Sequence, residues 1–235
     1  MPLMRRPRVW LAALMLCAGG PAAAGSLTVA PTRVDLAGGR TAGAVTLHNN
    51  APEPVLVQVE TFAWPRSAAT ADLEATTRLV AVPPVFSLPP DGKQVIRVAL
   101  REPHDGAAEE AYRLLITEVP KEGPTGGVQF ALRLSLPVFA TPEGAVAQPQ
   151  WSIGGSDGKA RLELVNAGTA HVQIQEIRLK SGSGAQQTIG EPSYVLAGQR
   201  RSWDLRLPVE AGTTVALEAD TSLGKLARSL AAAGR

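Results

Sequence analysis

The sequence has one cysteine, few aromatic residues and, beyond its first positions, no long apolar stretch. Cys17 is the single cysteine of the 235 residues, so the fold cannot depend on an internal disulfide. Phenylalanine, tryptophan and tyrosine together make up 4% of the chain, which disfavours an exposed aromatic platform for sugars. After residue 24 no apolar run is long enough to cross a bilayer, so we expect no membrane insertion of the remaining chain.

Runs of basic residues are also absent. The chain has 23 lysines and arginines against 21 acidic residues, and three of the basic residues, Arg5, Arg6 and Arg8, lie at the extreme N-terminus. Without these three the balance is 20 against 21, a net charge of about −1. The remaining basic residues do not cluster, which argues against a protein that binds nucleic acid or anionic membranes.

The first residues have the pattern of an export signal. The three N-terminal arginines precede an apolar segment, 9–18, that is too short to span a membrane, and small residues at 22–24 suit a cleavage site. This pattern predicts a signal peptide over residues 1–24. Leu16 precedes Cys17, where a lipoprotein signal would have a small residue. We therefore expect an exported protein whose mature chain has neither cysteine nor lipid.

The rest of the chain alternates short apolar–polar segments with turns rich in proline and glycine, such as 89–92 and 102–106. This pattern predicts an all-β chain of two tandem immunoglobulin-like β-sandwich domains, with a barrel or jelly roll as the alternative. The predicted strands are 27–34, 43–48, 55–64, 77–81, 93–101, 111–119 and 127–139, then 149–154, 159–166, 171–180, 193–197, 200–207, 213–219 and 225–230.

An internal similarity supports two copies of one fold. Segments 45–59 and 161–174 both read as an apolar strand, a turn containing asparagine, and a strand ending in Val-Gln-Val or Val-Gln-Ile. A boundary in 141–148 then gives an N-terminal domain over 25–141 and a C-terminal domain over 142–235. The tryptophans are the expected large core residues: Trp64 in the first domain, and Trp151 and Trp203 in the second.

The longest alternating segment is VQFALRLSLPVF at 128–139. Its apolar side chains recur at every second position, which predicts one long strand with an apolar face. A strand of this length extends past the body of a typical sheet. An overhanging apolar strand promotes aggregation unless another surface covers it, so we expect a partner on that face.

Catalytic and metal-binding patterns are weak. Ser156 lies in GGSDG, which resembles a nucleophile elbow, but Asp-Gly favours a hairpin turn and no helix follows. His48, His104 and His171 are isolated and are expected in turns or on the surface. We predict no catalytic residue, no metal and no cofactor.

These features, taken in order, resemble the periplasmic pilus-assembly chaperones of the chaperone–usher pathway. The resemblance rests on Arg33 in SLTVAPTRVDL, on LHNNAPEPVLVQVETFAW, PPVFSLPPDGKQVIRVALR and EEAYRLLITEVP, and on the long strand ending LPVFATP. It covers essentially the whole chain after the signal peptide, the first domain most strongly.

The resemblance implies a function for the overhanging strand. In this family the chaperone lends a strand to a pilin subunit that lacks one, which is donor-strand complementation. The matching apolar positions are Val128, Phe130, Leu132 and Leu134. The implied partners are pilin subunits and an outer-membrane usher.

The family also holds the pilin's terminal carboxylate with an arginine of the first strand, which Arg33 matches. Better-known members add a lysine on the donor strand, where this chain has Pro137. Three residues are candidates to replace that lysine: Arg97, Arg113 and Arg133. Leu115 stands where those members have asparagine, which indicates a divergent branch, with the archaic branch as the candidate.

Two other classes of protein fit a secreted chain of two β-sandwiches. An adhesive or carbohydrate-binding module is disfavoured by the low aromatic content. A pilin is a single incomplete sandwich, whereas this chain has two full sets of strands. Self-association of the unloaded chain through its exposed strand stays open.

Overall fold

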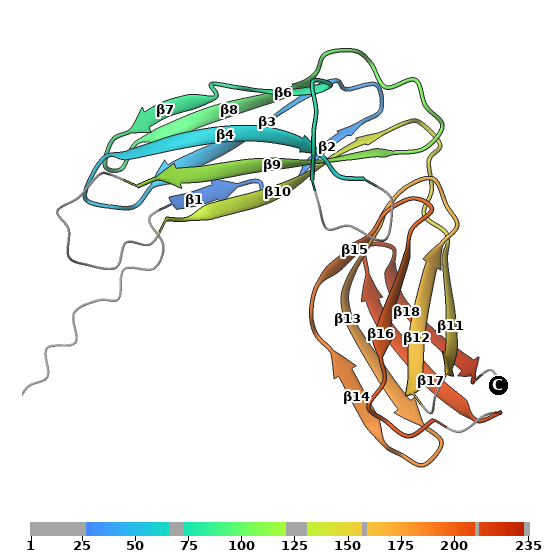
Figure 1. Ribbon diagram of the computed structural model, residues 1–235. Coiled ribbons are helices and arrows are strands. Elements are labelled where there is room, and N and C mark those ends of the chain that lie inside the picture. Colours follow the sequence, from blue (N-terminus) through green and yellow to red (C-terminus); the bar gives the residue numbers. More distant parts are fainter. Residues whose placement is uncertain (1–26, 66–72, 121–130, 157–158, 210–211, 233–235) are drawn as a thin grey trace, which may run out of the picture.

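The computed structural model describes residues 27–65, 73–120, 131–156, 159–209 and 212–232. These residues form strands and connecting loops, and among them no helix is long and apolar enough to span a membrane. Figure 1 shows two lobes joined at an angle, the first built from β1–β10 and the second from β11–β18. The prediction of an all-β chain of two sandwiches is confirmed.

The first lobe packs two sheets face to face. One sheet has the order β1-β3-β8-β6 and the other β2-β10-β9-β4-β5, with β7 also pairing β4. The bounds are β1 Leu27–Ala30, β2 Val34–Ala37, β3 Ala42–Asn49, β4 Val55–Ala63, β5 Glu74–Ala75, β6 Leu79–Val82, β7 Val85–Leu88, β8 Lys93–Leu100, β9 Glu110–Val119 and β10 Arg133–Thr141.

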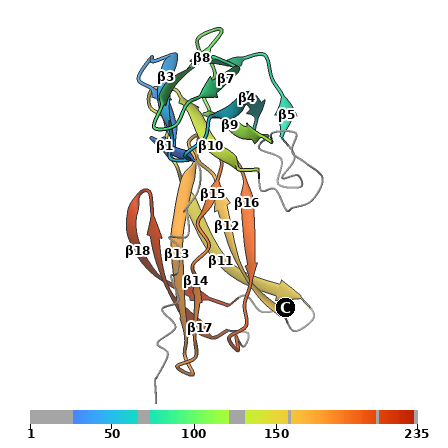
Figure 2. The same cartoon turned by 90° about the vertical axis from the view of Figure 1, so that its left-hand side faces the viewer.

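The second lobe repeats this architecture with a three-stranded sheet, β11-β12-β16, and a five-stranded sheet, β14-β13-β17-β18 with β15 pairing β13. The bounds are β11 Pro149–Ser156, β12 Lys159–Asn166, β13 Val172–Ser181, β14 Gln186–Ile189, β15 Ser193–Val195, β16 Arg200–Asp204, β17 Thr214–Thr221 and β18 Gly224–Ala231. Figure 2 shows these strands running along the length of the lobe.

Alternate side chains from facing sheets fill each core. In the first lobe Leu47 and Ile96 of one sheet meet Leu114 and Val138 of the other, and all four are fully buried. Burial of a side chain of this size is worth about 1.5–3 kcal/mol, so this contact between the sheets is a main source of stability. The second lobe has a separate core of the same kind.

The internal similarity predicted from the sequence corresponds to a shared structural role of two asparagines. Asn49 and Asn166 are fully buried at the ends of β3 and β12. The Nδ2 of each donates to backbone carbonyls, at 2.8–3.1 Å for Asn49 and 2.7–3.2 Å for Asn166. The Oδ1 of each accepts from the amide two residues ahead, that of Ala51 or Gly168. Each amide side chain thus satisfies a turn that would otherwise have buried, unpaired backbone groups.

The first predicted strand, 27–34, is wrong in one respect. It is divided into β1 and β2, which belong to different sheets of the first lobe. Pro31 lies between them and has no amide hydrogen to continue the pairing, so the chain crosses from one sheet to the other there. As a result, Arg33 lies at the crossing, next to β2, instead of inside a strand.

The tryptophans divide between two environments. Trp151 and Trp203 pack against the second core, as expected, with ring centroids 6.0 Å apart. Trp64 does not pack in the first core. It contacts Phe139 and Tyr194 at the junction between the lobes.

Candidate functional site

The N-terminal part of β10 lies at an edge of its sheet. β9 pairs β10 from Arg133 to Ala140, whereas β2 pairs β10 only from Val138 to Thr141. Within the described residues, the segment from Arg133 to Pro137 therefore has a neighbour on one side. Unpaired backbone groups of this kind can accept a further strand.

Apolar side chains continue from the core along this segment. Leu134 and Leu132 pack against the first core but stay partly exposed, whereas Arg133 and Ser135 point away and are exposed. The predicted strand began earlier, but the described strand begins at Arg133, although Leu132 still accepts a hydrogen bond from Glu118 N at 2.8 Å. Val128 and Phe130 lie outside the described residues.

Arg33 lies beside β10 on the face of the sheet that points away from the core. Val34, the next residue, pairs in parallel with Val138, which places Arg33 level with Pro137. Arg33 Nε donates to Asp35 Oδ2 at 2.9 Å, and the two side chains are 38% and 40% exposed. Partial burial lowers the pKa of Arg33, but Asp35 and Tyr194 outweigh this effect, so its pKa lies above the ordinary value.

Arg113 reaches the same place from the other side of β10. It lies directly opposite Pro137 in the antiparallel pairing of β9 with β10. Its guanidinium carbon is 3.6 Å from the centroid of the Trp64 ring, a cation–π contact that holds the side chain. Burial lowers the pKa of Arg113, and Tyr194 opposes this shift. A guanidinium group is not deprotonated in proteins, so Arg113 keeps its charge.

The other two candidates lie elsewhere. Arg97 is exposed on the opposite sheet of the lobe, between Ala44 and Val82. Arg133 lies four residues along β10 from Pro137, which corresponds to roughly 13 Å. Arg113 is thus the candidate that shares the level of Pro137 with Arg33.

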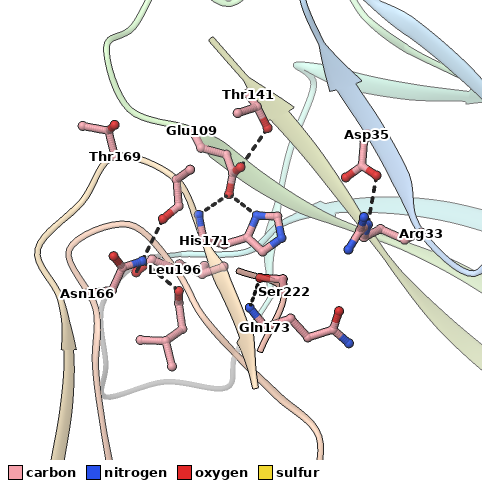
Figure 3. Close-up of polar contacts among 12 residues, drawn as sticks. Arg33, Asp35, Glu109, Thr141, Asn166, Thr169, His171, Gln173, Leu196 and Ser222 are labelled. Carbon is pink, nitrogen blue, oxygen red and sulfur yellow. Dashed lines mark hydrogen bonds and ion pairs between the residues drawn. The ribbon is translucent and has the colours of Figure 1, made fainter. Parts of the chain in front are cut away.

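A buried contact between the lobes forms the wall of this region, and Figure 3 shows its polar part. The Phe139 ring stacks on His171 with centroids 3.6 Å apart. Glu109, which is 3% exposed, accepts hydrogen bonds from Thr141 Oγ1 at 2.8 Å, from His171 N at 3.1 Å and from His171 Nδ1 at 2.7 Å. The contact joins the start of β9 and the end of β10 to the start of β13.

His171 lies in the connection between β12 and β13, in agreement with the expected turn, but it is neither isolated nor on the surface, since its side chain is 12% exposed within this contact. One signal in the sequence could have indicated it. Val138 and Phe139 are consecutive apolar residues that break the alternation, as expected where both faces of a strand are covered. Nothing in the sequence pairs Phe139 with His171 or Glu109 with Thr141.

Other chemistry-bearing residues are dispersed. Ser156 ends β11, and the turn predicted after it lies outside the described residues. His104 Nε2 contacts its own loop at Ala108 O, 2.8 Å away, and His48 lies on β3. The described ranges contain no cluster of metal-binding side chains.

Comparison with known proteins supports this architecture. Residues 26–146 match the model of the family described as pili and flagellar-assembly chaperone, PapD N-terminal domain. Chaperone protein FaeE of Escherichia coli is 30% identical over 137 residues, which cover 57% of this chain and 49% of FaeE. The chain thus spans about half the length of that relative. Chaperone protein FimB/FhaD of Bordetella pertussis is 27% identical over 194 residues, which cover 76% of this chain and 78% of the relative.

Solved structures show the same fold. A chain in the crystal structure of the CsuC-CsuE chaperone-tip adhesion subunit pre-assembly complex, from archaic chaperone-usher Csu pili of Acinetobacter baumannii, superimposes with a TM-score of 0.68 at 20% identity. The match covers 89% of this chain and 100% of the other. The family match and the two-sandwich fold together show that this chain belongs to the pili and flagellar-assembly chaperones.

Proposed function

We propose that this chain binds pilin subunits in the periplasm by donor-strand complementation and delivers them to an outer-membrane usher. The segment leading into β10 is the lent strand, and Arg33 and Arg113 hold the terminal carboxylate of the subunit. The observation that carries this proposal is the convergence of the two arginines on Pro137, beside the segment of β10 that pairs only with β9 among the described residues.

The apolar face of the segment at Leu132–Leu134 supports strand donation. Leu132 and Leu134 already pack at the end of the chaperone's own core, so a subunit groove placed there would extend that core. Val128 and Phe130 continue the same alternation in the sequence. Four such side chains contribute on the order of 6–12 kcal/mol before the cost of ordering is subtracted. A contribution of this size is enough to hold an incomplete sandwich in solution.

The two arginines support carboxylate binding. Guanidinium groups match a carboxylate with paired hydrogen bonds, and partial burial strengthens the contact. The Nε of Arg33 is engaged by Asp35, which leaves the Nη edge for the incoming group. Arg33 and Arg113 together with Asp35 carry a net charge of +1, which one carboxylate neutralises. Arg113 then takes the place of the lysine that the family resemblance implies at Pro137.

The proposed periplasmic location and the proposed pilin partners rest on the family to which the chain belongs. The chaperones of the chaperone–usher pathway are periplasmic, and residues 1–24 have the composition of a signal peptide that would direct export. Both relatives are named as chaperones, and the Acinetobacter complex pairs a chaperone with a tip adhesion subunit.

Co-production in the periplasm tests the function. The chain, carrying an affinity tag, is produced together with a pilin subunit of a chaperone–usher system, and the purified material is weighed by native mass spectrometry. We expect one chaperone bound to one subunit, with the subunit insoluble when it is produced alone. If the subunit stays insoluble, and the chain instead is retained on immobilised glycans, the chain is an adhesive module.

A further inference from the structure

The second lobe presents a tyrosine to the two arginines. Tyr194 lies on β15, directly opposite Gln173 of β13. Its neighbours Ser193 and Val195 are buried in the second core, so the alternation of the strand turns Tyr194 to the outer face of the sheet.

Aromatic contacts hold the Tyr194 ring against the first lobe. The ring meets Trp64 edge-on at 5.8 Å between centroids, and lies 5.5 Å from Phe139 and 5.6 Å from His171. Trp64 carries the Arg113 guanidinium on its face. Tyr194, Trp64 and Arg113 therefore form one continuous line of contacts at the junction of the lobes, with the hydroxyl as the polar end of the Tyr194 side chain.

The electrostatic effects of Tyr194 agree with this position of its ring. Tyr194 raises the pKa of Arg33 and partly offsets the lowering of the pKa of Arg113 by burial. The effect on Arg33 includes a hydrogen bond between the two side chains, which places the phenol oxygen beside that guanidinium. Arginine has donors and no acceptor, whereas a phenol is both, so the oxygen accepts from guanidinium and its proton remains available.

We propose that the Tyr194 hydroxyl donates a hydrogen bond to the carboxylate that Arg33 and Arg113 bind, so that the second domain supplies part of the binding site. This inference rests on the proposed function of the two arginines. A neutral donor adds a directed contact without disturbing the match between the single positive charge of the site and one carboxylate. Because Tyr194 belongs to the second lobe and the arginines to the first, the site is complete only when the Phe139–His171 and Glu109–His171 contacts hold the lobes together.

The substitution Tyr194→Phe tests this step, because it removes the hydroxyl and keeps the ring. The probes are a synthetic peptide of alternating apolar and polar residues with a free C-terminal carboxylate and the same peptide as its C-terminal amide. Calorimetric titration of the mature chain with each probe gives the preference for the acid. Tyr112→Phe is the matched control, since Tyr112 is the other tyrosine of the chain and its hydroxyl donates to Glu110 at 2.6 Å.

The wild-type chain should prefer the acid, and Arg33→Ala should abolish the preference. Tyr194→Phe should reduce the affinity for the acid about tenfold, with affinity for the amide and the melting temperature nearly unchanged. Tyr112→Phe should lower the melting temperature and keep the preference. If Tyr194→Phe keeps the wild-type preference while Arg33→Ala removes it, the role of Tyr194 is wrong and the proposed function stands. If the wild-type chain shows no preference, both are wrong.

Discussion

Pro137 of β10 lies directly opposite Arg113 of β9. Side chains of directly opposed residues in an antiparallel pair have Cβ atoms about 4.5–5.5 Å apart, so a long side chain on either strand reaches the same place. Pro137 carries no charge, so the positive charge at this level of β10 comes from Arg113 on the neighbouring strand. The Trp64 ring holds the Arg113 guanidinium in place through their cation–π contact.

The substitution Arg113→Ala should weaken subunit binding by about 2 kcal/mol or more, roughly 30-fold, because the carboxylate loses one of two cations in a partly desolvated site. Stability should fall by about 1 kcal/mol through loss of the contact with Trp64. Arg97→Ala removes an equal charge from the far sheet and is the control. Equal affinities of the two variants for a pilin subunit, measured by titration, would remove Arg113 from the site.

Arg33 should affect binding more than stability. Arg33→Ala breaks a partly exposed ion pair with Asp35, worth at most about 1 kcal/mol to folding, so the melting temperature should hardly change. Subunit recovery should collapse, since truncation of one partner of a desolvated charge pair costs about 2–5 kcal/mol. Arg33→Lys keeps the charge but loses the paired hydrogen bonds, so subunit recovery with this variant should lie between that of the wild type and that of Arg33→Ala. A large drop in melting temperature with full recovery of the subunit would make Arg33 a structural residue.

The lent strand should tolerate charge on one face only. Leu132→Asp places a carboxylate on the apolar face and should abolish subunit capture at a cost of several kcal/mol. Arg133→Asp introduces the same group on the exposed face and should leave capture nearly intact. The amount of soluble subunit recovered after periplasmic co-production measures the effect of each substitution. Similar recovery with both variants would rule out strand donation through this face.

Features set by neighbouring residues could be predicted from the sequence. The alternation of β10, the turns at 89–92 and the asparagine turns at Asn49 and Asn166 each depend on a few consecutive residues, and the two-sandwich fold followed from them. The interruption of the first strand at Pro31 could also have been predicted, because a proline within an alternating segment argues against a continuous strand.

Features set by register or by contact between the lobes could not be predicted. Choosing Arg113 over Arg97 and Arg133 requires knowing which residue of β9 faces Pro137, and a shift of one residue would turn Arg113 into the core. The contact of Glu109 with His171 joins residues 62 positions apart in different lobes. Neither residue type has a spacing that indicates the other.

Glu109 should control how the lobes are joined. Glu109→Ala leaves the donors of Thr141 and His171 without their acceptor, at about 1–3 kcal/mol for each buried group. Unfolding by guanidinium should report the loss of stability, and limited proteolysis should cut faster within 142–148. Glu109→Gln retains an acceptor oxygen and is expected to lie nearer the wild type. If Glu109→Ala matches the wild type in both assays, the polar contact does not hold the lobes.

Hydrogen exchange tests strand donation most directly, with the free chain compared to the chain loaded with a pilin subunit. The amides between Leu132 and Leu136 that do not bond to β9 face an edge that has no partner strand within the described ranges. We predict that loading slows their exchange strongly, because the subunit's strand pairs with them, while β3 and β8 on the opposite sheet keep their rates. Unchanged exchange between Leu132 and Leu136 in a loaded complex, or protection confined to β3 and β8, would contradict the account.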